Sequence, residues 1–374
     1  MDARRYATGG APAPPKLTPA SQARVWASVA ARIDALADPN AAPRPARPAV
    51  ARRVFPPDFP EGLKPRLRLF LSVDLVGSTS YKQSRQQWSP EILSFYRNFD
   101  YALQAQYRAF SEGHRTALPA PEFWKSNGDE LLYVCELQNL SHAHAVIHLW
   151  LAALNDYRAM GDATKPMDVK STAWIGLFPA PNAEIFFRRG APPPASDAGD
   201  PVLAQADLRE EWYANPNNPA ITRDFVGPSM DTGFRLTSWA TPRRMIVSVD
   251  LAFVLTGAYT RGVGPLRLHF SGKDKLKGVI GNQPYPTIWI PVGDERPSPE
   301  GLRADGISTD RATIRAHCES IIEQNYRSIT PLFLAGARHE DFDWVPPYIL
   351  TRILKNWQDE VQYRTDVTGV VLLD

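Results

Sequence analysis

The stretch RLRLFLSVDLVGST, residues 66–79, places one carboxylate, Asp74, at the end of an apolar run and directly before a Gly-Ser-Thr turn. Apolar and β-branched residues in such a run predict a buried strand. Gly77 and the hydroxyl side chains after it mark the end of that strand. A single acidic residue at this place is commonly an ordinary turn residue. It becomes a candidate ligand if a second acidic group meets it there.

The segments that follow alternate between short apolar runs and longer amphipathic patterns, which predicts an α/β (α+β) fold with helices packed on a sheet. The expected order is a strand at 66–75, a helix at 89–110, a hairpin at 122–137, a helix at 141–160, a strand at 171–180, a loop running into a helix at 223–240, a strand at 243–250 and a strand pair around 272–290. The Asn127-Gly128 pair is the strongest turn signal in the hairpin.

Three regions differ in composition along the 374 residues. Residues 1–60 are rich in Pro and Ala, with one helical pattern at 21–37, which predicts an extended N-terminal tether. Residues 61–297 have the size of one catalytic domain, with a Pro- and Gly-rich insertion at about 188–222. Residues 298–374 carry two further helical patterns, at 310–327 and 345–360, and are expected to form a C-terminal helical extension.

The overall charge excludes a global field for nucleic acid or an anionic membrane, because the formal net charge is only +2. No apolar run is long enough for a membrane span, and the N-terminus lacks the apolar core of a secretory signal. Cys135 and Cys318 lie far apart without metal-site spacing. We therefore expect a soluble, cytoplasmic protein without a disulfide framework.

A second acidic residue, Asp129, follows the Asn-Gly turn of the hairpin. If the hairpin pairs beside the first strand, Asp74 and Asp129 project from the same edge of the sheet. Two carboxylates without Cys or His beside them suit Mg²⁺ or Mn²⁺ bound together with substrate phosphates. Either residue alone is more often structural, so the prediction depends on the two occurring together.

Four motifs carry a resemblance to class III nucleotidyl cyclases. The sequence FLSVDLVGST resembles the first metal motif of that family, and KSNGDELL, residues 125–132, resembles its Lys-x-x-Gly-Asp motif. DFVGPSMDTGFRL, residues 224–236, is similar to the Asp-x-x-Gly, Asn and Arg motif, and LKGV, residues 276–279, is similar to the motif of the triphosphate lysine. The motifs follow the family order and span about residues 66–291.

The resemblance implies a role for each matching residue. Asp74 and Asp129, with the backbone carbonyl of Leu75, would hold two divalent cations, Mn²⁺ or Mg²⁺. Lys125 of KSNGDELL and Asp224 of DFVGPSMDTGFRL would recognise the base. Arg235 would brace the transition state, and Lys277 would hold the triphosphate. The reaction implied is attack of the ribose 3′-hydroxyl on the α-phosphorus, with release of pyrophosphate.

One position departs from the family pattern. Asp231 stands where the family has a transition-state Asn. A carboxylate cannot donate a hydrogen bond to ribose or phosphate, so Asp231 would instead orient Arg235 or bind metal. Because Asp231 precedes Arg235 by four residues, a plain surface ion pair on one helical face is an equally good interpretation.

The Lys125 and Asp224 pair does not determine which base the protein binds. Adenine and cytosine present the same hydrogen-bond donor and acceptor in the same order, and uracil presents them shifted by one place. Bulky Phe123 and Trp124 beside Lys125 favour a smaller base, but the commoner role of one or both in such a strand is ordinary core packing. The Pro-rich N-terminus, the motif wording and the helical C-terminal extension resemble the pyrimidine cyclases of bacterial Pycsar anti-phage systems. This resemblance implies cUMP, or cCMP, made for a separate effector, and a head-to-tail homodimer with sites at the subunit interface. The alternatives are an adenylate cyclase and a catalytically silent nucleotide-binding homologue.

Overall fold

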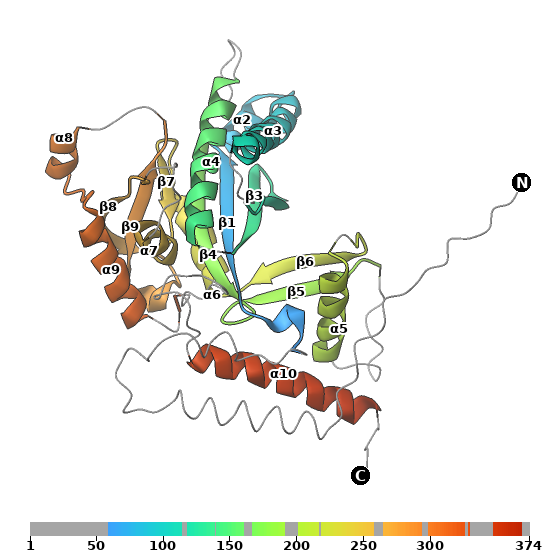
Figure 1. Ribbon diagram of the computed structural model, residues 1–374. Coiled ribbons are helices and arrows are strands. Elements are labelled where there is room, and N and C mark those ends of the chain that lie inside the picture. Colours follow the sequence, from blue (N-terminus) through green and yellow to red (C-terminus); the bar gives the residue numbers. More distant parts are fainter. Residues whose placement is uncertain are drawn as a thin grey trace, which may run out of the picture.

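The computed structural model describes residues 59–113, 118–138, 140–160, 167–190, 201–216, 218–257, 265–293, 298–325, 328–329 and 347–368. The predicted helix at 21–37 lies outside these residues. A central sheet runs through the molecule, with helices along one face and a separate two-stranded arm projecting from its lower end (Figure 1).

Seven strands form the central sheet, in the order β2-β3-β1-β4-β7-β9-β8. Their bounds are β1 Arg66–Leu75, β2 Glu122–Asn127, β3 Glu130–Leu137, β4 Val169–Phe178, β7 Arg244–Val247, β8 His269–Lys275 and β9 Pro284–Pro291. The order β2-β3-β1-β4 joined through helices is the ferredoxin-type arrangement, so the predicted α/β fold class is confirmed.

Helices cover one face of this sheet. The helix bounds of this part are α2 Ser78–Ser84, α3 Ser89–Gly113, α4 Leu140–Ala159 and α7 Val249–Gly257. Helices α3 and α4 lie together along the first four strands, and α7 packs against α4 and β4 (Figure 1). Their apolar faces bury Phe95, Phe99 and Trp150 against the sheet. The predicted helices at 89–110 and 141–160 are confirmed.

Strand β1 is buried, because β3 and β4 pair with its two edges and other parts of the chain cover both of its faces. Alternate residues such as Leu69 and Leu71 face the helices, whereas Phe70 faces a smaller aromatic cluster on the opposite side. Asp74 belongs to the Phe70 side by the same alternation. The end of β1 thus carries a carboxylate on the face that α3 and α4 do not cover.

The arm is a second sheet of two antiparallel strands, β5 Ala183–Arg188 and β6 Ile221–Val226, with helix α5 Pro201–Ala214 packed on it. The sequence patterns predicted only an insertion and a loop here. Strand β6 replaces the predicted loop at the beginning of 223–240, and α6 Pro228–Leu236 follows it. Strands β5 and β6 have six residues each and form a sheet of their own. Their apolar alternation is too short to predict strands from the sequence.

In the described part of the C-terminal segment, three helices are present, α8 Pro299–Ala304, α9 Arg311–Gln324 and α10 Pro347–Thr368. Helix α9 packs on α7 beside the sheet, and α10 lies below the arm against α5 (Figure 1). Within the described ranges, no helix is both long and apolar enough to cross a membrane. The domain boundaries at residues 60 and 297 remain predictions.

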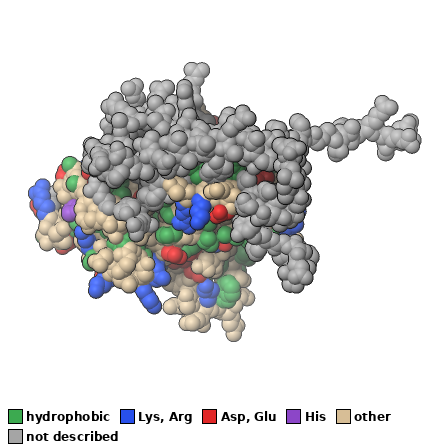
Figure 2. All heavy atoms as spheres, turned by 90° about the horizontal axis from the view of Figure 1, so that it is seen from below, with side chains coloured by type: hydrophobic (Ala, Val, Ile, Leu, Met, Phe, Trp, Pro, Cys, Tyr) green, Lys and Arg blue, Asp and Glu red, His purple; other side chains and the backbone are tan. Residues whose placement is uncertain are grey.

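The surface seen from below carries acidic and basic side chains close to one another (Figure 2). No field of a single sign covers the described part of that face. This agrees with the net charge of +2 and leaves charge recognition to local clusters.

Candidate functional site

Asp74 and Asp129 meet at one end of the central sheet. Asp74 lies in register between Glu130 of β3 and Lys170 of β4. The backbone N–H of Leu75 donates to the carbonyl oxygen of Asp129 at 3.4 Å, which fixes the β2–β3 turn beside the end of β1. The two side chains are 24% and 19% exposed, so they are half-buried yet reachable. The structure therefore brings together the two predicted metal ligands.

The local backbone explains this convergence. Gly128 has a φ of 66°, a left-handed conformation that few other residues adopt, and it turns the hairpin so that Asp129 follows at the edge of the sheet. Gly77, with a φ of 76°, plays the same part after β1 and starts α2. Ser78 of that helix then donates a hydrogen bond to Asp129.

The charges around the two carboxylates differ. Burial raises the pKa of Asp74, and the charge of Asp129 together with a hydrogen bond shared with it adds to the rise, while Lys170 at 3.1 Å opposes it. Burial would also raise the pKa of Asp129, but hydrogen bonds from Ser78 and Lys82 outweigh it and lower that pKa. A proton entering the pair is therefore held by Asp74.

The residues present fit divalent cations that are shared with a phosphate ligand. Asp74 and Asp129 supply two hard oxygen donors, and the repulsion between their charges contributes to the raised pKa of Asp74. A bound dication would offset this repulsion. The amines of Lys170 and Lys82 each contact one carboxylate. Among the residues that the structure describes, no group of three or more His, Cys, Asp or Glu side chains could hold an ion. Further ligands would have to come from the substrate and from backbone oxygens such as that of Leu75.

Three side chains near the pair were missed by sequence reasoning. Glu130 lies opposite Asp74, accepts a hydrogen bond from Ser72 at 2.5 Å and has a pKa that burial raises. Lys170 and Lys82 come from β4 and α2. The alternation of β1 and β4 could have placed Lys170 on this face, but their relative register is a tertiary property.

Lys125 and Asp224 form an ion pair of 2.9 Å between β2 and β6. Both side chains are more than one-third exposed, so the pair lies at the surface and is accessible to a ligand. The Lys125 amine also lies over the Trp124 ring, 4.1 Å from its centroid. The predicted base-recognition residues are thus brought together, as one cationic donor next to one acceptor.

The two aromatic residues beside Lys125 lie on different sides of β2. Successive strand residues point to opposite faces, so Trp124 packs with Phe70 and Phe225 while Phe123 meets Tyr133. A bulge after Phe123 then makes Lys125 pair with Leu132. Of the two aromatic residues, it is Trp124 that borders the Lys125 and Asp224 pair. The expectation that both rings narrow a base pocket is wrong for Phe123.

Asp231 and Arg235 are exposed one turn apart on α6. Both residues are described, and no ion pair joins them, so the predicted surface pair is not formed. The guanidinium of Arg235 instead lies beside Gly278, with its Nη2 atom 3.7 Å from where a Cβ at that glycine would stand. Lys277 immediately precedes this glycine and is exposed. Arg235 and the LKGV segment are therefore neighbours.

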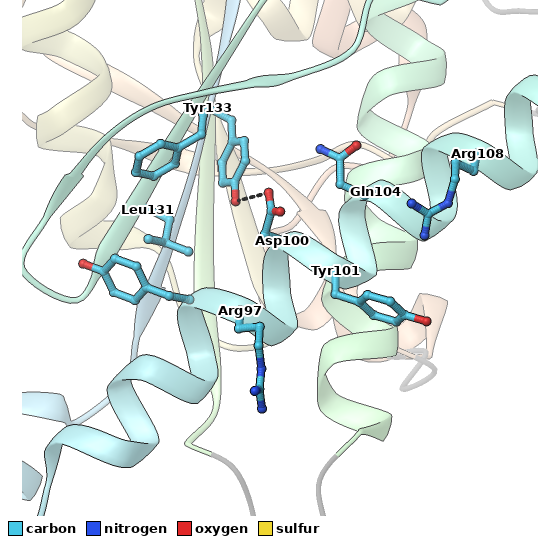
Figure 3. A pocket seen from close by; sticks show the side chains of 9 residues that line it. Arg97, Asp100, Tyr101, Gln104, Arg108, Leu131 and Tyr133 are labelled. Carbon is cyan, nitrogen blue, oxygen red and sulfur yellow. Dashed lines mark hydrogen bonds between the residues drawn. The ribbon is translucent and has the colours of Figure 1, made fainter. Parts of the chain in front are cut away.

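A pocket of about 640 Å³ lies on the helix side of the β2–β3 hairpin, between α3 and β3. Its walls include Asp100 and Tyr133, which share a hydrogen bond of 3.1 Å (Figure 3). Tyr96 of the same wall donates to the carbonyl oxygen of Gly128 at 2.5 Å. None of the predicted site residues lines this pocket. Its connection to the site is the hydrogen bond from Tyr96, which stabilises the turn before Asp129.

No protein-family model matches the sequence, and no curated protein matches it. Solved structures with a similar arrangement include the guanylyl cyclase Cya2, with 14% identity over 63% of this chain and 96% of that chain at a TM-score of 0.39. The adenylyl cyclase CyaB from P. aeruginosa has 13% identity over 62% of this chain and 97% of that chain at a TM-score of 0.38.

The guanylate cyclase domain of RhGC from Catenaria anguillulae, solved in complex with GTP, has 11% identity over 62% of this chain and 100% of that chain at a TM-score of 0.41. Identities and superpositions this low carry no conclusion about what this chain binds or catalyses. The functional proposal therefore depends on the residues of the site.

Proposed function

We propose that this protein is a nucleotide cyclase that converts a pyrimidine nucleoside triphosphate, preferably UTP, into its 3′,5′-cyclic monophosphate and pyrophosphate. The convergence of Asp74 and Asp129 at one sheet edge carries this proposal. The four cyclase-like motifs, in order along the sequence, supply the reaction class. Formation of cCMP from CTP belongs to the same proposal.

Each side chain has a chemical task in this reaction. Asp74, Asp129 and the Leu75 carbonyl would hold two Mn²⁺ or Mg²⁺ ions, which when bound would acidify the 3′-hydroxyl and offset the charge of the pyrophosphate. Arg235 would donate hydrogen bonds to the α-phosphate oxygens as charge accumulates there. Lys277 would hold the triphosphate end. Asp231 cannot donate to either group, and it forms no ion pair with Arg235 among the described residues, so we assign it to metal binding or to orienting Arg235 once nucleotide is bound.

Base recognition is assigned to Lys125 and Asp224. The amine donates and the carboxylate accepts, and the two groups lie 2.9 Å apart. Uracil presents an acceptor oxygen next to an N–H donor, so its edge can meet the amine and the carboxylate side by side and form one hydrogen bond with each. Trp124 adds an aromatic wall on the side of the amine, which supports a small base.

We also propose a head-to-tail homodimer with two sites, in which the carboxylates of one subunit face Arg235 and Lys125 of the other. The support is the family resemblance of the motifs. The product would serve as a second messenger in anti-phage defence, read by a separate cyclic-nucleotide effector, as the resemblance to pyrimidine cyclases suggests.

The deciding experiment incubates the purified protein with each of the four NTPs and Mn²⁺ and identifies the products by mass spectrometry. We expect cUMP from UTP and none from the Asp74→Asn variant. Formation of cAMP alone would favour an adenylate cyclase. No cyclic product from any NTP would favour a silent nucleotide-binding homologue and would overturn the proposal.

A further inference from the structure

The position of Asp224 depends on helix α5. Asp224 pairs directly with Ile185 across the arm. On one side of Ile185, the amide side chain of Gln205 makes two hydrogen bonds to the backbone of Phe186, of 2.9 Å to its N–H and 2.6 Å to its carbonyl oxygen. On the other side, Tyr213 donates to Glu184 at 2.5 Å. Both Gln205 and Tyr213 belong to α5, so this helix holds β5 at the two residues that flank the partner of Asp224.

The strand side of this connection is anchored to the central sheet. Arg68 of β1 contacts Glu184 at 2.8 Å and Tyr213 at 3.0 Å. Arg68 is 4% exposed, so this ion pair is buried. Buried pairs of this kind are costly to break because one charge is left without a partner. The base of the arm is therefore fixed relative to β1, the strand that carries Asp74.

The outer side of α5 is held by the C-terminal helix α10. Arg209 of α5 donates two hydrogen bonds to Glu360 of α10, each of 2.7 Å, in the parallel geometry of a bidentate pair. The two residues are 9% and 6% exposed. The rings of Phe59 and Trp357 of α10 pack edge to face with their centroids 4.9 Å apart. The stem of Arg209 also lies across Gly62, where a Cβ would stand 2.5 Å from Arg209 Cδ.

We propose that Arg209 and Glu360 are positioning residues for the base site. Through this ion pair, helix α10 stabilises the position of α5 and so keeps Asp224 beside Lys125. The route is continuous: Glu360 holds Arg209, α5 holds residues 184 and 186, and Ile185 between them pairs with Asp224. The proposal rests on the proposed function for its catalytic readout and on the structure alone for its local-stability readout. It gives the C-terminal extension a defined role at the nucleotide site.

The test compares Glu360→Gln with Asp359→Asn, a control that removes the same charge one residue away, where no ion pair is formed within the described residues. Hydrogen–deuterium exchange is measured at residues 221–226. We expect exchange on the order of ten times faster in Glu360→Gln, with β1 and β3 unchanged, and no change in the control. Unchanged exchange in Glu360→Gln would overturn this stabilising role, whatever the enzyme does.

The catalytic readout separates positioning from general destabilisation. We expect Glu360→Gln to raise KM for the nucleotide about tenfold and to leave kcat within about twofold, because the carboxylates and Arg235 are not displaced. The charge-swapped double variant Arg209→Glu/Glu360→Arg should recover most of the loss. Faster exchange with an unchanged KM, or failure of the swap to improve on the single variants, would overturn the link to Asp224. Absence of activity in the unmodified protein would instead refute the cyclase assignment, and the exchange result would stand.

Discussion

The backbone N–H of Leu75 and the backbone carbonyl of Asp129 share a hydrogen bond of 3.4 Å. This contact joins the end of β1 to the β2–β3 turn, so Asp74 and Asp129, which are 55 positions apart in the numbering, lie close enough for their side chains to interact. A pair of neighbouring anions without a dication is unfavourable for the folded protein, and such local cost is typical of functional sites.

Removing either carboxylate should abolish cyclase activity. We expect Asp74→Ala and Asp129→Ala to lower kcat/KM at least about 100-fold, because each removes a ligand of the ions that stabilise charge in the transition state. Product formation with UTP and Mn²⁺ measures the effect, and circular dichroism checks the fold. Retained turnover in either variant contradicts the two-metal assignment.

The stability of the metal-free protein should depend on the ionisation of Asp74. Its pKa is raised above the ordinary 3.8, so just above pH 3.8 the folded state binds more protons than the unfolded chain. The stability contributed by this group is therefore present below pH 3.8 and falls as the pH rises through the raised pKa.

At neutral pH, Asp74→Asn should accordingly raise the Tm in EDTA, on the order of 2 °C, since it removes a charge that is disfavoured by its partial burial and by the charge of Asp129, and that Lys170 only partly offsets. Addition of Mn²⁺ should raise the Tm of the unmodified protein and leave that of Asp74→Asn nearly unchanged. Thermal unfolding measures both. An equal Mn²⁺ effect on the two proteins would place the ion elsewhere.

Lys125 and Asp224 should determine which base is accepted. Lys125→Ala and Asp224→Ala each leave one hydrogen-bonding group of the base without its protein partner, so kcat/KM for the preferred NTP should fall roughly 10- to 100-fold while discrimination among the four NTPs narrows. Competition assays with mixed NTPs report the ratio. Unaltered base preference in both variants would exclude these residues from base recognition.

Gly233 should tolerate no side chain. A Cβ at this residue would stand 2.1 Å from Cδ2 of the fully buried Trp174, so Gly233→Ala must push α6 away from β4. We expect a loss of about 1–3 kcal/mol in the free energy of unfolding and a marked loss of activity, because Arg235 is on the same helix. Denaturant unfolding provides the measurement. The exposed Ser238→Ala serves as control, and equal stability of the two variants would contradict the packing described for α6.

The proposed head-to-tail dimer predicts complementation. Mixing Asp74→Ala with Arg235→Ala subunits after partial unfolding and refolding yields mixed dimers in which one site carries both defects and the other carries none. Activity should return to roughly a quarter of the unmodified level in a random mixture, although each variant alone is inactive. A mixture as inactive as its components would refute shared sites.

The sequence by itself determined the α/β class, the strand that ends at Asp74, the hairpin turned by Gly128 and the long helices, because each is encoded by local periodicity or by a residue with special backbone freedom. Only the tertiary structure decided the arm, in which β5 and β6 pair with each other and α5 packs on β5, and the burial of Arg209 against Glu360. Register also lay outside the sequence: a bulge between Phe123 and Lys125 makes Lys125 pair with Leu132, so that the Lys125 amine lies over the ring of its neighbour Trp124. Such features depend on contacts between segments far apart in the chain, which no local pattern specifies.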